Sequence, residues 1–144
     1  MRILGIDYGE KRTGLAISDP LGITAQPLPT VEGLSMEELL KKISEIATEK
    51  EVEEIVVGLP RNMNGTVGKA GERVMDFAAR LEAEAGCRVM VEDERLTTMM
   101  ADRALTALGE KPKARRRKLD RMAAQLILQS YLDRKRADAG ARDA

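Results

Sequence analysis

Acidic side chains at three separate points of the chain could together support metal-assisted chemistry. Asp7 ends a short apolar run, Asp93 and Glu94 follow a later one, and Asp120 lies near the start of the last amphipathic segment. If the acids converge, two carboxylates about 4 Å apart repel by on the order of 4 kcal/mol at an effective dielectric near 20. Such a cluster needs a cation or raised pKa values. Ligation by oxygen alone suits Mg²⁺ or Mn²⁺, which polarise phosphates and generate hydroxide from water.

Each acid also has a purely structural interpretation. Asp7 precedes a Tyr-Gly pair and could be an ordinary turn residue. Asp120 near a helix start would be favourable to the helix macrodipole without any further role. Asp93 and Glu94 are neighbours in a strand, so only one of them can face a shared site. The spacing alone leaves these alternatives open.

The composition removes other kinds of chemistry. The chain has no histidine, which excludes Ser–His and Cys–His nucleophile pairs and His-ligated zinc. A single cysteine, Cys87, excludes an internal disulfide and a cysteine-based zinc site. There is no apolar stretch of the ~18 residues that a membrane span needs, and the apolar start is too short for a signal peptide. We therefore expect a cytoplasmic protein with no membrane partner, built as one domain over 1–136 with a flexible tail over 137–144.

Positive charge gathers close to the last acid, although the net charge is zero. The basic segment, residues 111–121, holds seven cations and one acid. Within it, Lys111 to Arg117 favours contact with a nucleic-acid backbone, and a solvated linker between helices is the alternative. The glycine-flanked turn after Asp7 could cradle phosphate or form an ordinary hairpin. Aromatic residues make up only 2%, so recognition should depend on phosphate charge and shape, not on stacked bases. The expected nucleic-acid contacts are Lys11, Arg12, Arg61, Asn62, Arg95, Lys113, Arg115, Arg116 and Arg117.

The hydrophobic pattern predicts the elements that must position these side chains. Strands over 3–6, 13–18 and 22–28 are joined by short gaps, which favours an antiparallel meander with the proline-containing third strand at an edge. Strands separated by helices should be parallel. The pattern therefore predicts an α/β fold, with a mixed five-stranded sheet (an antiparallel three-stranded meander plus two parallel strands) and helices on both faces.

The remaining elements alternate between helices and two strands. The strands cover 55–57 and 87–91. The predicted helix starts are a capping box of Ser35 and Glu38, a cap at Thr66, a cap at Thr97 or Thr98, and, after a basic loop, Leu119.

Four motifs follow one another along nearly the whole chain. They are Gly5-Ile6-Asp7-Tyr8-Gly9 with Lys11-Arg12-Thr13-Gly14-Leu15-Ala16, Val57-Gly58-Leu59-Pro60-Arg61-Asn62-Met63-Asn64-Gly65-Thr66, Asp93-Glu94-Arg95-Leu96-Thr97-Thr98, and Asp120 with Ala123-Ala124 and Ile127-Leu128. Together these motifs resemble the YqgF family, also called RuvX. The resemblance implies a ribonuclease H-like fold akin to the RuvC junction resolvases.

The resemblance also implies roles for individual residues. Carried over position by position, Asp7, Glu94 and Asp120 become the catalytic acids and the ligands of one or two Mg²⁺ or Mn²⁺ ions, with Asp7 between them. The choice of Glu94 over Asp93 comes from the family. The implied activity is maturation of the 5′ end of the 16S ribosomal RNA precursor, and resolution of Holliday junctions is an older proposal for the family.

Three classes of function compete at this stage. The first is a hydrolase that cuts phosphodiesters in precursor rRNA, or in branched DNA, by a two-metal-ion mechanism. The second is a non-catalytic nucleic-acid-binding module in ribosome assembly or transcription. The third is a nucleotide hydrolase of the actin and sugar-kinase type, whose phosphate loop also reads Gly-Ile-Asp-x-Gly. A chain of 144 residues is too short for the two lobes of that third class. Monomer and homodimer both remain open.

Overall fold

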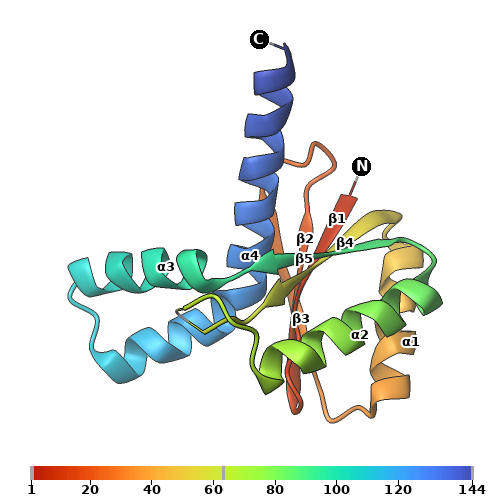
Figure 1. The fold of residues 1–144 in the computed structure, drawn as a ribbon, viewed down its shortest axis with the longest axis horizontal. Coiled ribbons are helices and arrows are strands. Elements are labelled where there is room, and N and C mark those ends of the chain that lie inside the picture. Colours follow the sequence, from red (N-terminus) through yellow and green to blue (C-terminus); the bar gives the residue numbers. More distant parts are fainter. Residues whose placement is uncertain (1, 63, 144) are drawn as a thin grey trace.

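The computed structural model describes residues 2–62 and 64–143, apart from the side chains of residues 95–100, 120 and 141–143. In this part of the chain one mixed sheet has the strand order β3-β2-β1-β4-β5 (Figure 1). Its strands are β1 (Arg2–Asp7), β2 (Arg12–Ser18), β3 (Ala25–Glu32), β4 (Val52–Leu59) and β5 (Arg88–Asp93). The first three strands pair antiparallel, whereas β4 lies parallel to both β1 and β5. The predicted meander plus two parallel strands is confirmed.

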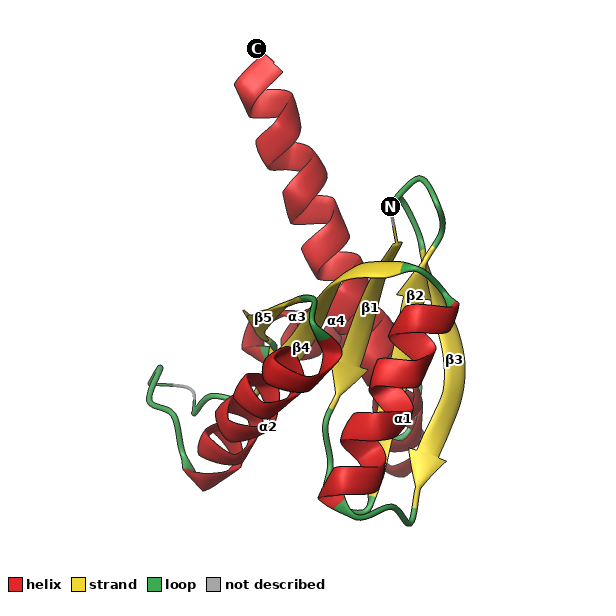
Figure 2. Cartoon of the chain, turned by 90° about the vertical axis from the view of Figure 1, so that its right-hand side faces the viewer, coloured by secondary structure: helices red, strands yellow, loops and turns green. Residues whose placement is uncertain are grey.

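Helices cover both faces of this sheet, as the sequence predicts. The helices are α1 (Met36–Glu49), α2 (Lys69–Ala85), α3 (Arg95–Ala107) and α4 (Pro112–Asp143). Figure 2 shows α1 and α2 on one face and α4 crossing behind the other. Helix α3 packs against the first turns of α4, and the two form a hairpin that projects beyond the sheet (Figure 1). No described helix is both long enough and apolar enough to span a membrane.

The alternation of side chains along each strand divides the core into two layers. On β1, Leu4 and Ile6 belong to the layer under α1 and α2, whereas Ile3 belongs to the layer under α4. The α4 layer also contains Val56 of β4 and Leu128 of α4. Since neighbouring residues of a strand face opposite sides, every second position of β1, β4 and β5 faces α4. This parity decides which strand-end residues can share one site.

The predicted start of the first helix is confirmed in detail. The Glu38 backbone N–H donates to Ser35 Oγ over 3.2 Å, and the Ser35 N–H donates to Glu38 Oε1 over 3.0 Å. The edge position of β3 is also confirmed, although the strand runs on to Glu32, which pairs with Arg12 of β2. An edge strand accepts prolines because one side of its backbone needs no ladder partner.

The predicted loop over the basic segment is wrong, because this segment forms the first turns of α4. Proline is well placed in the first turn of a helix, and Pro112 opens this one. The helix then gains two contacts, from Arg115 to Asp102 of α3 and from Lys118 to Glu110. At its other end α4 continues as a helix to Asp143, through the residues expected to form a tail. The flexibility of those residues, and the single domain over 1–136, stay predictions.

Two predicted helix starts also differ from the structure. Helix α2 is capped by Gly68, not by Thr66, whose hydroxyl is engaged instead with the Asn64 and Asn62 side chains of the preceding loop. Helix α3 begins at Arg95, directly after β5, so the predicted caps at Thr97 and Thr98 lie inside the helix. The short polar side chain of a threonine suits a helix cap, but α3 has already begun two residues before Thr97.

Candidate active site at the carboxyl ends of the strands

Asp7 lies at the carboxyl end of β1, on the face that α4 crosses. Its neighbour Tyr8 stacks on Phe77 of α2 with ring centroids 4.3 Å apart, so the two residues face opposite layers. Asp7 pairs with Gly14 of β2. A Cβ at Gly14 would lie 3.7 Å from Asp7 Cβ and 3.5 Å from Ala124 Cβ. Asp7 is therefore next to the point where α4 meets the sheet.

Glu94, the residue after β5, lies on the face of the sheet that α4 covers. A Cβ at Gly58 of β4 would meet both Ile127 of α4 and Glu94 Oε2, so these two side chains lie on the same side of the sheet. Asp93 Oδ2 lies 3.8 Å from Nε of Arg61, in the loop after β4. These contacts place Glu94 on the face of Asp7.

The surroundings of Glu94 disfavour its negative charge. Burial, then the charges of Asp7 and Asp93, raise the pKa of Glu94 to about 7. Its Oε2 lies over Gly58 of β4, where a Cβ would come within 2.7 Å of it. Because Gly58 has no side chain, the Glu94 carboxylate can occupy this position. Two neighbouring half-buried carboxylates form an oxygen-only donor set, which fits Mg²⁺ or Mn²⁺.

Helix α4 reaches this end of the sheet because glycine on β1 allows it to lie close. A Cβ at Gly5 would come within 2.6 Å of Leu128 Cβ and 3.1 Å of the Ala124 carbonyl oxygen. Further along α4, Tyr131 donates a short hydrogen bond to Glu54, near the amino end of β4. The helix thus runs from the carboxyl ends of the parallel strands toward their amino ends.

This direction places residue 120 beside Asp7. Position 120 precedes Ala124 by four residues, about 6 Å along the axis of α4. The backbone of α4 therefore brings the third predicted acid to the end of the sheet that holds Asp7. The side chain of Asp120 lies outside the described residues, as does that of Arg95. Among the described side chains, no three acids, histidines or cysteines group closely enough to hold a metal ion.

The other predicted contact residues fall into two groups. Arg61 and Asn62 organise the loop after β4: Arg61 Nη1 donates to the Gly65 carbonyl over 3.2 Å, and Asn62 Nδ2 donates to Thr66 Oγ1 over 2.9 Å. The other predicted cations are exposed or half-buried, and they come from the turn before β2, from the first residue of β2 and from the first turns of α4: Lys11, Arg12, Lys113, Arg115, Arg116 and Arg117.

Two kinds of residue are missing from the contacts that the sequence predicts. Lys118 and Arg121 line a cavity with Arg12 and Arg117. Arg121 lies four residues after Arg117, so helical spacing indicates it once the segment is interpreted as a helix, whereas Lys118 follows Arg117 directly and has no such signal. Gly5 was quoted only as part of a motif, and its role in the approach of α4 depends on a tertiary contact.

The sheet order and the helical layers on its two faces define a ribonuclease H-like fold. The chain belongs to the RuvX family, whose sequence model, described as "Holliday junction resolvase", matches residues 1–134. Two similar curated proteins are named "Putative pre-16S rRNA nuclease". The one from Clostridium novyi (strain NT) is 46% identical over 92% of this chain and 98% of its own length. The one from Syntrophus aciditrophicus (strain SB) is 50% identical over 92% and 89%.

Solved structures support the same fold. T. thermophilus RuvC in complex with a Holliday junction substrate superposes with a TM-score of 0.64 at 17% identity, over 96% of each chain. The fowlpox virus Holliday junction resolvase gives 0.53 at 14% identity, over 92% of this chain and 99% of that one. The predicted family and the predicted ribonuclease H-like fold are both confirmed.

Proposed function

We propose that this chain is a metal-dependent endonuclease that cuts the 5′ end of precursor 16S rRNA in the cytoplasm. The observation that carries the proposal is the half-buried Glu94 beside Asp7, on the sheet face that α4 crosses. A fold does not gather repelling carboxylates at strand ends without something to offset them. The names of the curated relatives support precursor rRNA as the substrate.

The proposed ligands of one or two Mg²⁺ or Mn²⁺ ions are Asp7, Glu94 and Asp120. Bound at such a site, these ions neutralise phosphate charge and lower the pKa of a coordinated water. The protein's part is to hold the carboxylates in place. Glu94 is fixed by its own backbone, since its N–H donates to the Leu59 carbonyl over 3.3 Å and so joins it to β4. Ile127 and Ala124 of α4 pack over the same strand ends and limit access of bulk water.

The decisive experiment compares cleavage of a transcript carrying the precursor 5′ extension, in Mn²⁺ and in EDTA. We expect a metal-dependent cut by the native chain, and a loss of about 10²-fold or more in Asp7→Asn and Glu94→Gln. Asp93→Asn is the matched control, because the Asp93 carboxylate lies 3.8 Å from Nε of Arg61, in the loop after β4. The control should cleave at a rate within a few-fold of the native chain.

Two results would count against this function. Full activity of Asp7→Asn in a clean preparation would show that the Asp7 carboxylate is not needed for cleavage. Salt-sensitive binding of the transcript without turnover by the native chain would favour a non-catalytic binding module.

A second substrate, four-way DNA, is favoured by the description of the family model. The same acids would serve, since both substrates present a phosphodiester to the site. A four-way junction in a parallel arm of the assay separates the two. Faster cleavage of the junction than of the transcript would make four-way DNA, and not precursor rRNA, the preferred substrate.

A further inference from the structure

A basic cavity, the α4 cradle, lies between the start of β2 and the first turns of α4. Its volume is about 490 Å³, and it is lined by Arg12, Ala114, Arg117, Lys118 and Arg121. Four of these five residues are cations, although Lys118 also pairs with Glu110, and no described lining residue is acidic. Specific ligand sites in proteins have volumes of about 300–1,000 Å³. The cradle thus has the size and the charge of a site for an extended anion.

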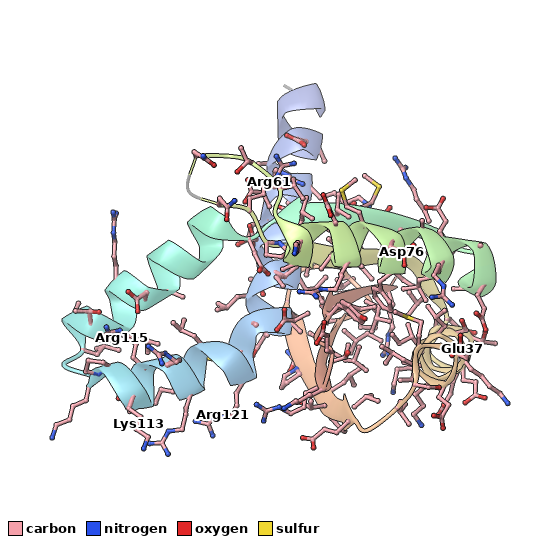
Figure 3. All side chains as sticks on the ribbon, turned by 60° about the horizontal axis from the view of Figure 1, so that its bottom comes forward. Glu37, Arg61, Asp76, Lys113, Arg115 and Arg121 are labelled. Atoms are coloured by element: carbon pink, nitrogen blue, oxygen red, sulfur yellow. The ribbon has the colours of Figure 1, made fainter. Side chains whose placement is uncertain are left out.

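The arginines of the cradle have no carboxylate partner among the described residues. Arg115, by contrast, is held by Asp102 of α3, with Nε 2.6 Å from Oδ1. Figure 3 shows Arg115 between α3 and α4, whereas Arg121 projects from the other side of α4. Unpaired guanidinium groups in a concave surface raise the local positive potential, and their planar forks match phosphate oxygens. Helix α4 therefore carries Arg115 bound to α3, and Arg117 and Arg121, which have no carboxylate partner among the described residues and can contact a ligand.

The cradle lies close to the acids both along β2 and along α4. Arg12 lies two residues before Gly14, the β-ladder partner of Asp7, which is about 7 Å along the strand. Arg117 and Arg121 lie within one helical turn of position 120 on α4. A strand whose phosphate sits at Asp7 would therefore bring its neighbouring phosphates to the cradle.

We propose that the α4 cradle binds the phosphodiester backbone of the substrate next to the bond that is cut. The inference rests on the proposed function and adds the place where the flanking phosphates are held. With no aromatic side chain in its lining, the cradle reads charge and not base identity.

The test measures log Kd against log salt in EDTA for a duplex RNA stem of the precursor and for a four-way DNA junction. The variants are Arg117→Ala, Arg121→Ala and the double variant. Each lost phosphate contact lowers the slope by about 0.9 for a duplex, so the double variant should lose about 2 units. Arg136→Ala is the matched control, because Arg136 is exposed on the same helix, pairs with Asp133 and does not line the cradle.

Restoring charge guards against a folding artefact. The Arg117→Lys/Arg121→Lys variant should recover most of the slope, since a point cation still neutralises phosphate. A reduced slope on either probe supports the cradle and shows which nucleic acid enters it. A double alanine variant with the slope of Arg136→Ala overturns the cradle on both probes.

The outcome is separable from that of the proposed function. If the double variant keeps the native slope while cleavage still depends on Asp7 and metal, the cradle is wrong and the nuclease stands. If the slope falls as expected while Asp7→Asn cleaves normally, the cradle is right and the nuclease mechanism is wrong.

Discussion

Glu94 carries a carboxylate where its charge is disfavoured, and this has a measurable effect on stability. An acid with a raised folded-state pKa makes the protein less stable above that pKa than below the unfolded value. For Glu94 the loss develops as pH rises from about 4.5 to about 7. The repulsion of Asp7 contributes to it, so removing the charge should stabilise the metal-free protein.

We predict that Glu94→Gln unfolds at higher urea than the native chain at pH 8 in EDTA. The expected gain is about 1 kcal/mol, discounted for partial exposure to solvent. Added Mg²⁺ should stabilise the native chain by mass action and leave the variant unchanged. Equal stability of the two proteins in EDTA would mean that the carboxylates do not repel.

Arg115 and Arg116 are neighbours in sequence with different environments. Arg115 Nε binds Asp102 and its Nη1 donates to the Glu110 carbonyl over 3.2 Å, which ties α4 to α3. We predict that Arg115→Ala lowers the free energy of unfolding by about 1–2 kcal/mol, because a half-buried charged hydrogen bond is lost. Arg116→Ala should stay within about 0.5 kcal/mol of the native value. Thermal or urea unfolding of both variants checks this, and an equal effect would contradict it.

At the scale of elements, the approach of α4 to β1 is what unites the site. The helix can cross at this distance only because position 5 has no side chain. Leu128 packs there, and the turn before it carries Ala124 to Gly14 beside Asp7. A wider crossing would leave position 120 displaced from the other acids.

We predict that Gly5→Ala lowers the free energy of unfolding by about 1–3 kcal/mol, the usual cost of overpacking. The cleavage rate should fall by more than the loss of folded protein explains, because α4 must move away from β1 and take position 120 with it. Gly140→Ala is the control, since a Cβ there meets nothing within 4 Å and alanine favours an exposed helix. A Gly5→Ala variant as stable and active as the control would show that the close crossing is unimportant.

Local signals in the sequence predict where helices and strands form, but they predict the contacts between these elements less well. The capping box of Ser35 and Glu38 and the alternation along the strands suffice for α1 and for the sheet order near β1. The helical start of α4 was missed because a run of like charges favours a solvated loop until Asp102 and Glu110 supply partners from elsewhere.

The choice between Asp93 and Glu94 shows the same limit within the site. Both are acids at one strand end, and the sequence cannot tell which side of the sheet each faces. The parity of β5 becomes known only when Val89 is seen in the α2 layer and Glu92 is seen paired with α4. The close crossing at Gly5 likewise has no local signature, because it joins residues 123 positions apart.

At the scale of the whole molecule, α4 has a packed part and an exposed part. Tyr131 and Leu132 are buried against the sheet, with exposed fractions of 8% and 1%. Residues 137–140 are exposed, and no side-chain hydrogen bond or ion pair joins this described part of the tail to the rest of the chain. The last turns of the helix therefore add little to the stability of the fold.

We predict that a chain ending at residue 136 keeps its free energy of unfolding within about 0.5 kcal/mol and cleaves normally. A chain ending at residue 130 is the comparison, since it loses the buried Tyr131 and Leu132 and should be several kcal/mol less stable. Circular dichroism under urea measures both. Severe destabilisation by the shorter deletion would assign a structural role to the exposed turns.

The most direct measurement is calorimetric titration of Mn²⁺ into the metal-free native chain and into Asp7→Asn, Glu94→Gln, Asp120→Asn and Asp93→Asn. If three acids share the ions, each of the first three variants should bind at least about tenfold more weakly, while Asp93→Asn binds like the native chain. Native-like Mn²⁺ binding by Asp7→Asn and Asp120→Asn would contradict the shared site.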